Sequence, residues 1–313
     1  MKVIKYITTL FDGLSLDKEV LIRKRFSKIR RNLSSFKLTY SPELNENLNS
    51  NDLSATTEKF LNFYTIYGID QAITAYGIKK ELHKKGITKL IYRLKKEDYT
   101  HTLSMYNEEV SVDHLVSQLI LTLEKKVKLD ELEFKAMTIE WLLLQDYRKE
   151  FKRKPLPGQR YPGIGLGFLM LELIIQMAKR LEIRYIVNAP LHLHNAIIYS
   201  KFFSFKDPKD KALIDKLSHE YRALSLASLS WLVENEAIIY QDSGEKLIWN
   251  PNLMIMPVYK CKKFSSFFLT KEYKKKYEEA FNSYSLKIDR EKFDKESYKY
   301  PNVVIEEIEE FLL

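Results

Sequence analysis

Residues 155–181 read PLPGQRYPGIGLGFLMLELIIQMAKRL, a loop rich in glycine and proline followed by a nearly continuous apolar stretch. The chain has only nine glycines and nine prolines. Glycine allows positive φ angles and lets the backbone approach a neighbouring molecule closely. We therefore expect the main-chain shape of this loop to matter. The residues concentrated here are Pro155, Pro157, Gly158, Pro162, Gly163, Gly165 and Gly167.

The apolar stretch predicts a helix over Leu166–Leu181. Its polar residues share one stripe, so most of the helix circumference is free to pack, as it would against a sheet. The start of such a helix presents unpaired N–H groups and the positive end of the helix dipole. That arrangement suits phosphate or another anion, and a tight turn before a core helix is the alternative. The polar stripe is Glu172, Gln176, Lys179 and Arg180.

Two common phosphate-loop patterns fit the loop poorly. The Walker pattern ends in Gly-Lys-Ser/Thr, which is absent here. The dinucleotide pattern needs a strand running directly into the glycines and an acid at the end of the next strand. Here the basic run 152–154 precedes the loop, and Glu182 comes before the next predicted strand.

A third pattern fits better. Residues 160–165, RYPGIG, match Q/R-x-x-G-x-G/A, and the loop resembles the pyrophosphate loop of the GNAT acyltransferase superfamily. A short strand over Ile183–Val187 and a second helix containing residues 195–203, NAIIYSKFF, extend the resemblance to residues 134–205. Aligned on Tyr199, the family's Asn falls on His192 and its Ala on Asn195, and Phe203-Ser204-Phe205 replaces the usual Gly-Phe.

The resemblance implies an α/β fold: a GNAT-like mixed twisted sheet flanked by helices, with an N-terminal helical extension and extra C-terminal elements. We divide the chain into an extension and linker (1–50), an acyl-CoA-binding core (51–260) and a C-terminal helical segment (261–313).

The resemblance also implies roles for individual residues. Backbone amides of the loop would bind the pyrophosphate of acetyl-CoA, used as a co-substrate, and a strand amide at Leu143 or Leu144 would polarise the thioester carbonyl. Tyr199 would be the general acid. The full set of residues implied for cofactor binding is Arg160, Gly163, Ile164, Gly165, Leu166, Gly167, Leu143, Leu144 and Asn195.

Three further residues are candidates for the general base. His192 and His194 follow the predicted short strand, and histidine titrates near neutral pH. Both would lie on one face of an extended segment, but a two-histidine metal site lacks an obvious third ligand nearby. Helix capping or core hydrogen bonding is the alternative role for these histidines. Glu140, on the predicted central strand, is the third candidate.

Composition and charge limit the class of protein and its expected location. Hydrophobic content of 45% and charged content of 30% are typical of a soluble globular protein. Lysines and acids are interleaved, so we do not take the net charge of +9 as a nucleic-acid signal. One cysteine excludes an internal disulfide. No apolar run has the length of a membrane span, and we expect a cytoplasmic protein.

Outside this region the pattern predicts mostly helices with a few strands. We expect a basic helix over 16–34, a polar linker over 41–56, and a helix over Asp70–Lys85. Met137–Leu144 is the expected central strand. We also expect strands over Thr88–Arg93 and His101–Tyr106. Further helices are expected over Val112–Glu124, 209–223, 224–236 and Val303–Leu312, and from Thr270 onward. A hairpin is expected to join Ala237–Tyr240 to Lys246–Trp249, with Leu253–Met256 as a possible extension of its second strand.

From these observations we expect an acyl-CoA-dependent N-acyltransferase acting on an amine, small or on a protein, that the sequence does not identify. A non-catalytic module that binds CoA or a nucleotide is the alternative. A basic nucleic-acid-binding helical protein is a third hypothesis, and it leaves the glycine-rich loop without a purpose.

Overall fold

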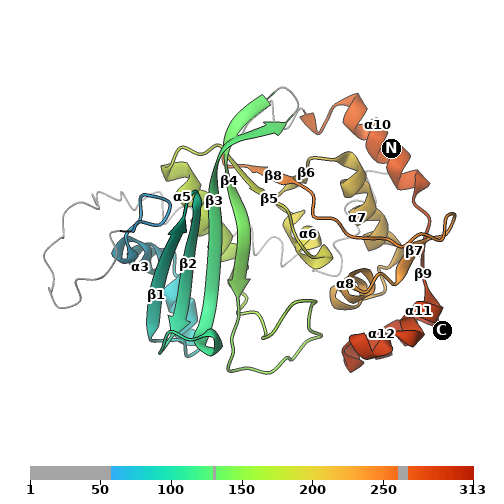
Figure 1. Cartoon of the computed structure of the whole chain (residues 1–313), viewed down its shortest axis with the longest axis horizontal. Coiled ribbons are helices and arrows are strands. Elements are labelled where there is room, and N and C mark those ends of the chain that lie inside the picture. The colour runs from blue at the N-terminus through green and yellow to red at the C-terminus, as the bar shows by residue number, and fades with distance from the viewer. Residues whose placement is uncertain (1–57, 130–131, 260–266) are drawn as a thin grey trace, which may run out of the picture.

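A computed structural model describes residues 58–129, 132–259 and 267–313. Seven strands form one sheet in the order β1-β2-β3-β4-β5-β8-β6, and β7 and β9 form a second, two-stranded sheet (Figure 1). The strands are β1 (Leu90–Glu97), β2 (Thr100–Asn107), β3 (Leu115–Leu129), β4 (Leu132–Leu144), β5 (Tyr185–Asn188), β6 (Ser204–Phe205), β7 (Ile238–Tyr240), β8 (Met254–Pro257) and β9 (Leu286–Ile288).

Helices flank the sheet. In Figure 1, α3 and α5 lie beside and behind β1–β4, whereas α6, α7 and α8 lie beyond β5, with α10, α11 and α12 outermost. The helices are α3 (Ile66–Ala75), α4 (Ile78–Lys84), α5 (Gly167–Arg180), α6 (Leu193–Tyr199), α7 (Pro208–Glu220), α8 (Leu226–Glu234), α10 (Lys271–Ser283), α11 (Arg290–Lys295) and α12 (Asn302–Leu312), with short 3-10 turns η1 (Val112–His114) and η2 (Ser297–Lys299).

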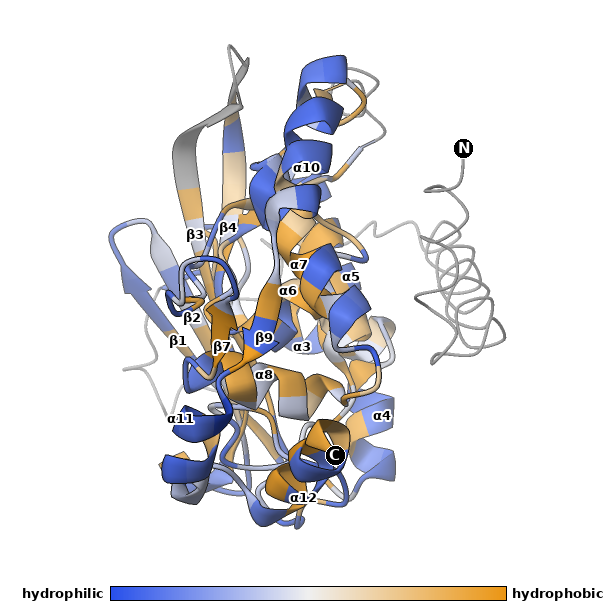
Figure 2. Cartoon of the chain, turned by 90° about the vertical axis from the view of Figure 1, so that its right-hand side faces the viewer, coloured by the Kyte–Doolittle hydropathy of each residue, from blue (hydrophilic) through white to orange (hydrophobic). Residues whose placement is uncertain are grey.

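One hydrophobic core joins the two halves of the described chain. It contains Met137 of β4 and Ile174 of α5 together with Val304 and Ile308 of α12. The outer helix α10 is mostly hydrophilic in Figure 2, and Ala280 is its one buried residue. The C-terminal helices therefore complete the core that the sheet begins.

The sheet contains a single parallel strand pair. Strands β1 to β4 form an antiparallel meander, and β4 then pairs in parallel with β5. A parallel neighbour needs a crossover connection, which here consists of residues 145–166 and α5. Strand β8 pairs with β5 on the far side, antiparallel, and β6 closes that edge.

Strands β4 and β5 pair over only four residues. Ala136–Ile139 face Tyr185–Asn188, and β4 then continues to Leu144 without a partner on that side. At the same point the register with β3 shifts. Ile120 of β3 faces Trp141, but the next residue, Leu121, faces Ile139, so Glu140 has no partner on β3. Glu140 is therefore the extra residue of a β-bulge, a feature that bends the strand that carries it. The two strands separate beyond this point.

Much of the predicted architecture is confirmed. The sheet flanked by helices is a mixed α/β fold. The loop leads into α5, the apolar run before it is the long central strand β4, and β1, β2 and β5 lie within a few residues of their predicted positions. The predicted helices near 209–223, 224–236, Thr270 and Val303–Leu312 correspond to α7, α8, α10 and α12.

The helix predicted over Val112–Glu124 is wrong. This segment is the turn η1 followed by β3. Its apolar residues suit either period, but β3 pairs with β2 on one edge and with β4 on the other. From Ser117 to Thr122 the strand has a partner on both edges, and the backbone hydrogen bonds made there outweigh local helix propensity.

Three other predictions need correction. The helix over Asp70–Lys85 is interrupted at Gly77, whose φ of +74° is left-handed and separates α3 from α4. The second helix of the resembling region ends at Tyr199, before residues 200–203. The hairpin at 237–249 is reduced to one bridge between Ile239 and Lys246, because β7 pairs with β9 instead. The helix expected over 16–34 and the linker over 41–56 lie outside the described residues.

Glu307 ties α12 to two other segments. Its carboxylate accepts hydrogen bonds from the Lys154 ammonium (2.6 Å), the Ser225 N–H (2.7 Å) and the Ser225 and Ser228 hydroxyls. It thus caps the start of α8 from another helix. Burial opposes ionisation of Glu307, but the bonds from Lys154, Ser228 and Ser225 outweigh it and lower the pKa of the carboxyl to about 2.

We predict that Glu307→Gln lowers the free energy of unfolding by about 1–3 kcal/mol at neutral pH, because it removes the charge that four donors share. The lowered pKa means that this stabilisation is present above about pH 4.5 and is lost as the pH falls toward 2. Urea denaturation across that range should show the difference between wild type and variant shrinking. Glu309→Gln, an exposed change on the same helix, is the control; an equal loss there would contradict the assignment.

Candidate functional site

The glycine-rich loop returns to the end of β4. Gly163 forms an isolated antiparallel bridge with Gln145, in which the Ile164 N–H donates to the Leu144 carbonyl (3.4 Å) and the Asp146 N–H to the Pro162 carbonyl (2.8 Å). This bridge brings residues 163–167 to the carboxyl end of β4. The start of α5 therefore lies near the carboxyl end of β4, beyond the point where β4 and β5 separate.

The start of α5 has free N–H groups. Leu166 is the N-cap residue, no side chain caps the helix, and its first turn contains no acid. The N–H groups of Gly165, Leu166 and Gly167 have no hydrogen-bond partner among the described residues. A Cβ atom at Gly165 or Gly167 would meet nothing within 4 Å, and the φ of Gly165 is +76°. Gly165 and Gly167 are exposed, and their free N–H groups lie at the positive helix end, as an anion site requires.

Asn188 is the residue that the sequence analysis missed. It ends β5, faces Ile139 across the last parallel pair, and is 2% exposed. Both its Oδ1 and its Nδ2 are buried without a hydrogen-bond partner in the described structure. Leaving a buried polar atom unpaired costs about 1–3 kcal/mol, so such an amide indicates a missing ligand or water. A polar residue ending an otherwise apolar strand was the available signal.

The two predicted strand amides differ in direction. The Gln145 N–H donates to Val116 of β3, and backbone groups of a strand alternate between its two edges. Leu143, two residues earlier and opposite Gln118, therefore points to β3 as well. Leu144 points to the open edge, and its carbonyl meets the loop. By the same alternation Leu142 points to the open edge, so Leu142 and Leu144, rather than Leu143, direct their amides toward the separation.

His192 is oriented by a carboxylate. Its Nδ1 lies 3.0 Å from the Glu234 Oε2 at the end of α8. The other ring nitrogen, Nε2, packs against Gly158, where an added Cβ would lie 3.0 Å away. A histidine held by a carboxylate is a common arrangement for a general base. Glu234 could not be found from the sequence, because it is 42 residues away.

His194 stacks on His192 with ring centroids 5.2 Å apart and planes within 10°. It is 4% exposed, and its Nδ1 has no partner among the described residues. Burial, with a smaller contribution from His192, lowers the pKa of His194 to about 4. His194 is therefore neutral near pH 7, and as a buried ring it supports His192 better than it would serve as a base.

Tyr199 ends α6 and packs edge-on against Phe203 with ring centroids 5.6 Å apart. Burial raises the pKa of Tyr199 to about 12, so the phenol is protonated at neutral pH. Its hydroxyl makes no hydrogen bond among the described residues. The Phe202 ring, just beyond α6, packs against the Phe168 ring in the first turn of α5, with ring centroids 5.4 Å apart. The end of α6 thus lies next to the free amides of α5.

The remaining predicted residues lie at the margins of this region. Glu140 is the bulged, exposed residue of β4. Arg160 has a side chain 61% exposed, pairs with Asp113 (3.0 Å) and lies over the Tyr161 ring. Asn195 is half-buried in the first turn of α6, and its N–H donates to the His192 carbonyl.

The basic residues before the loop serve mainly the fold. The Arg148 guanidinium binds Asp146 and donates to the carbonyls of Gly86 and Lys85, which closes the end of α4. Lys154 is held by Glu307. Two cations of this basic stretch are therefore held by carboxylates of the fold.

Neither a scan against protein-family models nor a search of curated proteins gives a match for this chain. Within the described ranges, no three His, Cys, Asp or Glu side chains are grouped to hold a metal ion. In the same part of the chain, no helix has both the length and the apolar character that crossing a bilayer would require.

We predict that Gly158→Ala is more destabilising than Gly244→Ala. Both glycines have left-handed φ angles, +75° and +72°, so an L-residue costs about 1 kcal/mol at either. The new methyl meets the His192 ring only at position 158, which should add about 1 kcal/mol and shift the His192 ring signals in NMR spectra. Equal losses of stability and an unshifted His192 ring in both variants would refute this packing.

Proposed function

We propose that this protein is an acyl-CoA-dependent N-acyltransferase of the GNAT type, with acetyl-CoA as the expected donor. The observation that carries the proposal is the unpaired carboxamide of Asn188 at the strand separation, together with the free amides at the start of α5. Coenzyme A matches this pair of features: its pyrophosphate is an anion, and its pantetheine arm contains secondary amides. A secondary amide offers one donor and one acceptor, which are the two partners that Asn188 lacks.

The reaction assigns a task to each group. An amine nitrogen attacks the thioester carbonyl carbon, a C–N bond forms, and the C–S bond breaks. His192, oriented by Glu234, takes the proton that the amine loses. Tyr199 gives its proton to the departing thiolate, since the raised pKa keeps the phenol protonated. The open-edge amides of Leu142 and Leu144 polarise the carbonyl oxygen, where charge develops.

The alternative, a non-catalytic module that binds CoA, shares the loop and Asn188 but has no use for His192 and Tyr199. It keeps support from the sequence, because Phe203-Ser204-Phe205 stands where the resembling family has Gly-Phe. Binding of CoA without turnover of acetyl-CoA against a broad amine panel would favour this alternative.

Calorimetric titration with CoA tests the site. We predict saturable binding of CoA and acetyl-CoA, with NAD and ATP binding at least about tenfold more weakly, because neither has a pantetheine arm to pair with Asn188. Well-folded protein that does not bind CoA would overturn the proposal.

A negative charge introduced at the loop distinguishes an effect on CoA binding from an effect on folding. Gly167→Asp places a carboxylate at the first position of α5, where an acid stabilises a helix but repels phosphate. We predict unchanged or slightly raised thermal stability and at least about a tenfold loss of CoA affinity. Asn302→Asp, the same charge change at the first position of α12, is the matched control. Similar CoA affinities for both variants would remove α5 from the site.

The role of Tyr199 has its own test. Tyr199→Phe should lower the turnover number by about 10²-fold, the usual contribution of a general acid, and leave CoA affinity within about a factor of two, because only the free hydroxyl is lost. Tyr284→Phe, a change of the same kind on the far side of α7, is the control. An unchanged turnover number in Tyr199→Phe would exclude the phenol from proton transfer.

A further inference from the structure

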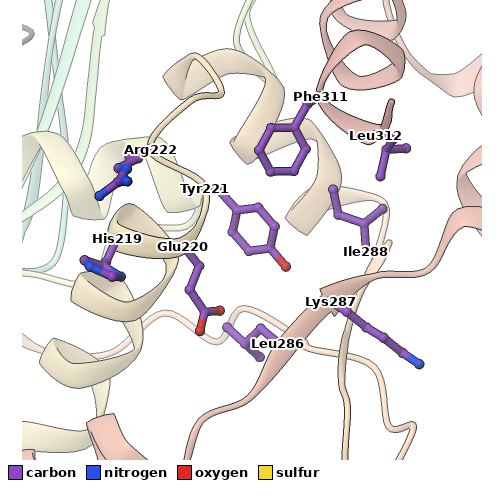
Figure 3. A pocket seen from close by; sticks show the side chains of 9 residues that line it. All are labelled: His219, Glu220, Tyr221, Arg222, Leu286, Lys287, Ile288, Phe311 and Leu312. Atoms are coloured by element: carbon purple, nitrogen blue, oxygen red, sulfur yellow. The ribbon is translucent and has the colours of Figure 1, made fainter.

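A pocket lies apart from the strand separation, on elements from the C-terminal half of the described chain. It has a volume of about 540 Å³, and its walls come from the end of α7, from β9 and from the end of α12 (Figure 3). Leu286, Ile288, Phe311 and Leu312 give it an apolar surface. None of its lining residues belongs to the candidate CoA site.

Two buried polar atoms at this cavity lack partners. Tyr221, 5% exposed, has an unpaired hydroxyl, and Glu220 has one unpaired carboxylate oxygen, Oε2. The other oxygen of Glu220 already binds Lys216 at 3.2 Å. In Figure 3 both polar groups point toward the side of the cavity formed by β9. Burial raises the pKa of Tyr221, so its hydroxyl is a neutral donor.

The charges around the cavity are mixed. Glu220 is the acid on the inner wall, whereas Arg222 and Lys287 are exposed cations that flank it on opposite sides. A purely anionic ligand would meet Glu220 at the inner wall, and a purely cationic one would meet the two outer cations. A ligand that carries both charges on a small apolar body matches the whole set.

We propose that this cavity binds an apolar α-amino acid. The ammonium group donates to the Glu220 Oε2, the carboxylate lies toward Arg222 or Lys287 and accepts from Tyr221, and the side chain contacts Phe311 and Leu312. The volume accommodates a side chain the size of leucine or phenylalanine. The site is independent of the proposed acyltransferase activity.

Calorimetric titration of the full chain tests the charge requirement directly. The probes are L-leucine and L-phenylalanine, with N-acetyl-L-leucine lacking the ammonium charge and L-leucinamide lacking the carboxylate. We expect saturable binding of at least one amino acid, and about tenfold weaker binding of each blocked leucine, since a lost bond to a charged group weakens binding by that order. Saturating CoA should leave the amino-acid affinity unchanged. If neither amino acid binds, or if the blocked forms bind equally well, the proposal is wrong.

Substitutions in the pocket test where the amino acid binds. Glu220→Gln should weaken binding of the amino acid about tenfold, and Leu312→Trp should abolish it by filling the cavity. Glu279→Gln, on the exposed face of α10, should leave it unchanged. Because Leu312→Trp alters no polar group, it still reports on the site if Glu220→Gln is poorly folded. Wild-type affinity in both cavity variants would overturn the location.

Discussion

The parallel pairing of β4 with β5 is the constraint on which the candidate site depends. In an otherwise antiparallel sheet this one pair requires a crossover, and the crossover places the free N-terminus of α5 near the carboxyl end of β4. The bulge at Glu140 ends the pairing after four residues, so the edge of β4 is open between Ile139 and the bridge that joins Gln145 to Gly163. The parallel pair and its crossover therefore carry all three features: the free amides of α5, the unpaired Asn188 carboxamide and the open edge of β4.

The anion binding that we propose at this place uses the main chain at the start of α5. Arg148 closes the end of α4 and Lys154 is held by Glu307, so these two cations before the loop are committed to packing. The glycines leave space in front of the amides. Backbone donors are fixed by the helix and need no side-chain ordering when an anion arrives. This explains why scarce glycines are concentrated where lysines could have been placed.

Sequence patterns predicted what local chemistry determines. The glycine-rich loop, α5 and the central strand have strong local signals, and each lies close to its predicted position. The strand β3 was mistaken for a helix because its pairing with β2 and β4 is not encoded locally. The partnership of His192 with Glu234 and the cavity beside Tyr221 could not be predicted, because each joins elements distant in sequence. Asn188 had a signal, a polar end to an apolar strand, that single-sequence reasoning did not use.

The loop between β4 and α5 is irregular, yet several distant elements hold it. Lys154 attaches it to α12, the Pro155 carbonyl accepts from Trp231 of α8, and Gly158 lies against His192. A loop held in this way cannot move away from the rest of the chain unless its contacts with α12 and α8 also break. The loop thus belongs to the same cooperative unit as the C-terminal helices. A destabilising substitution in α12 would therefore affect the start of α5 without any direct contact between the two.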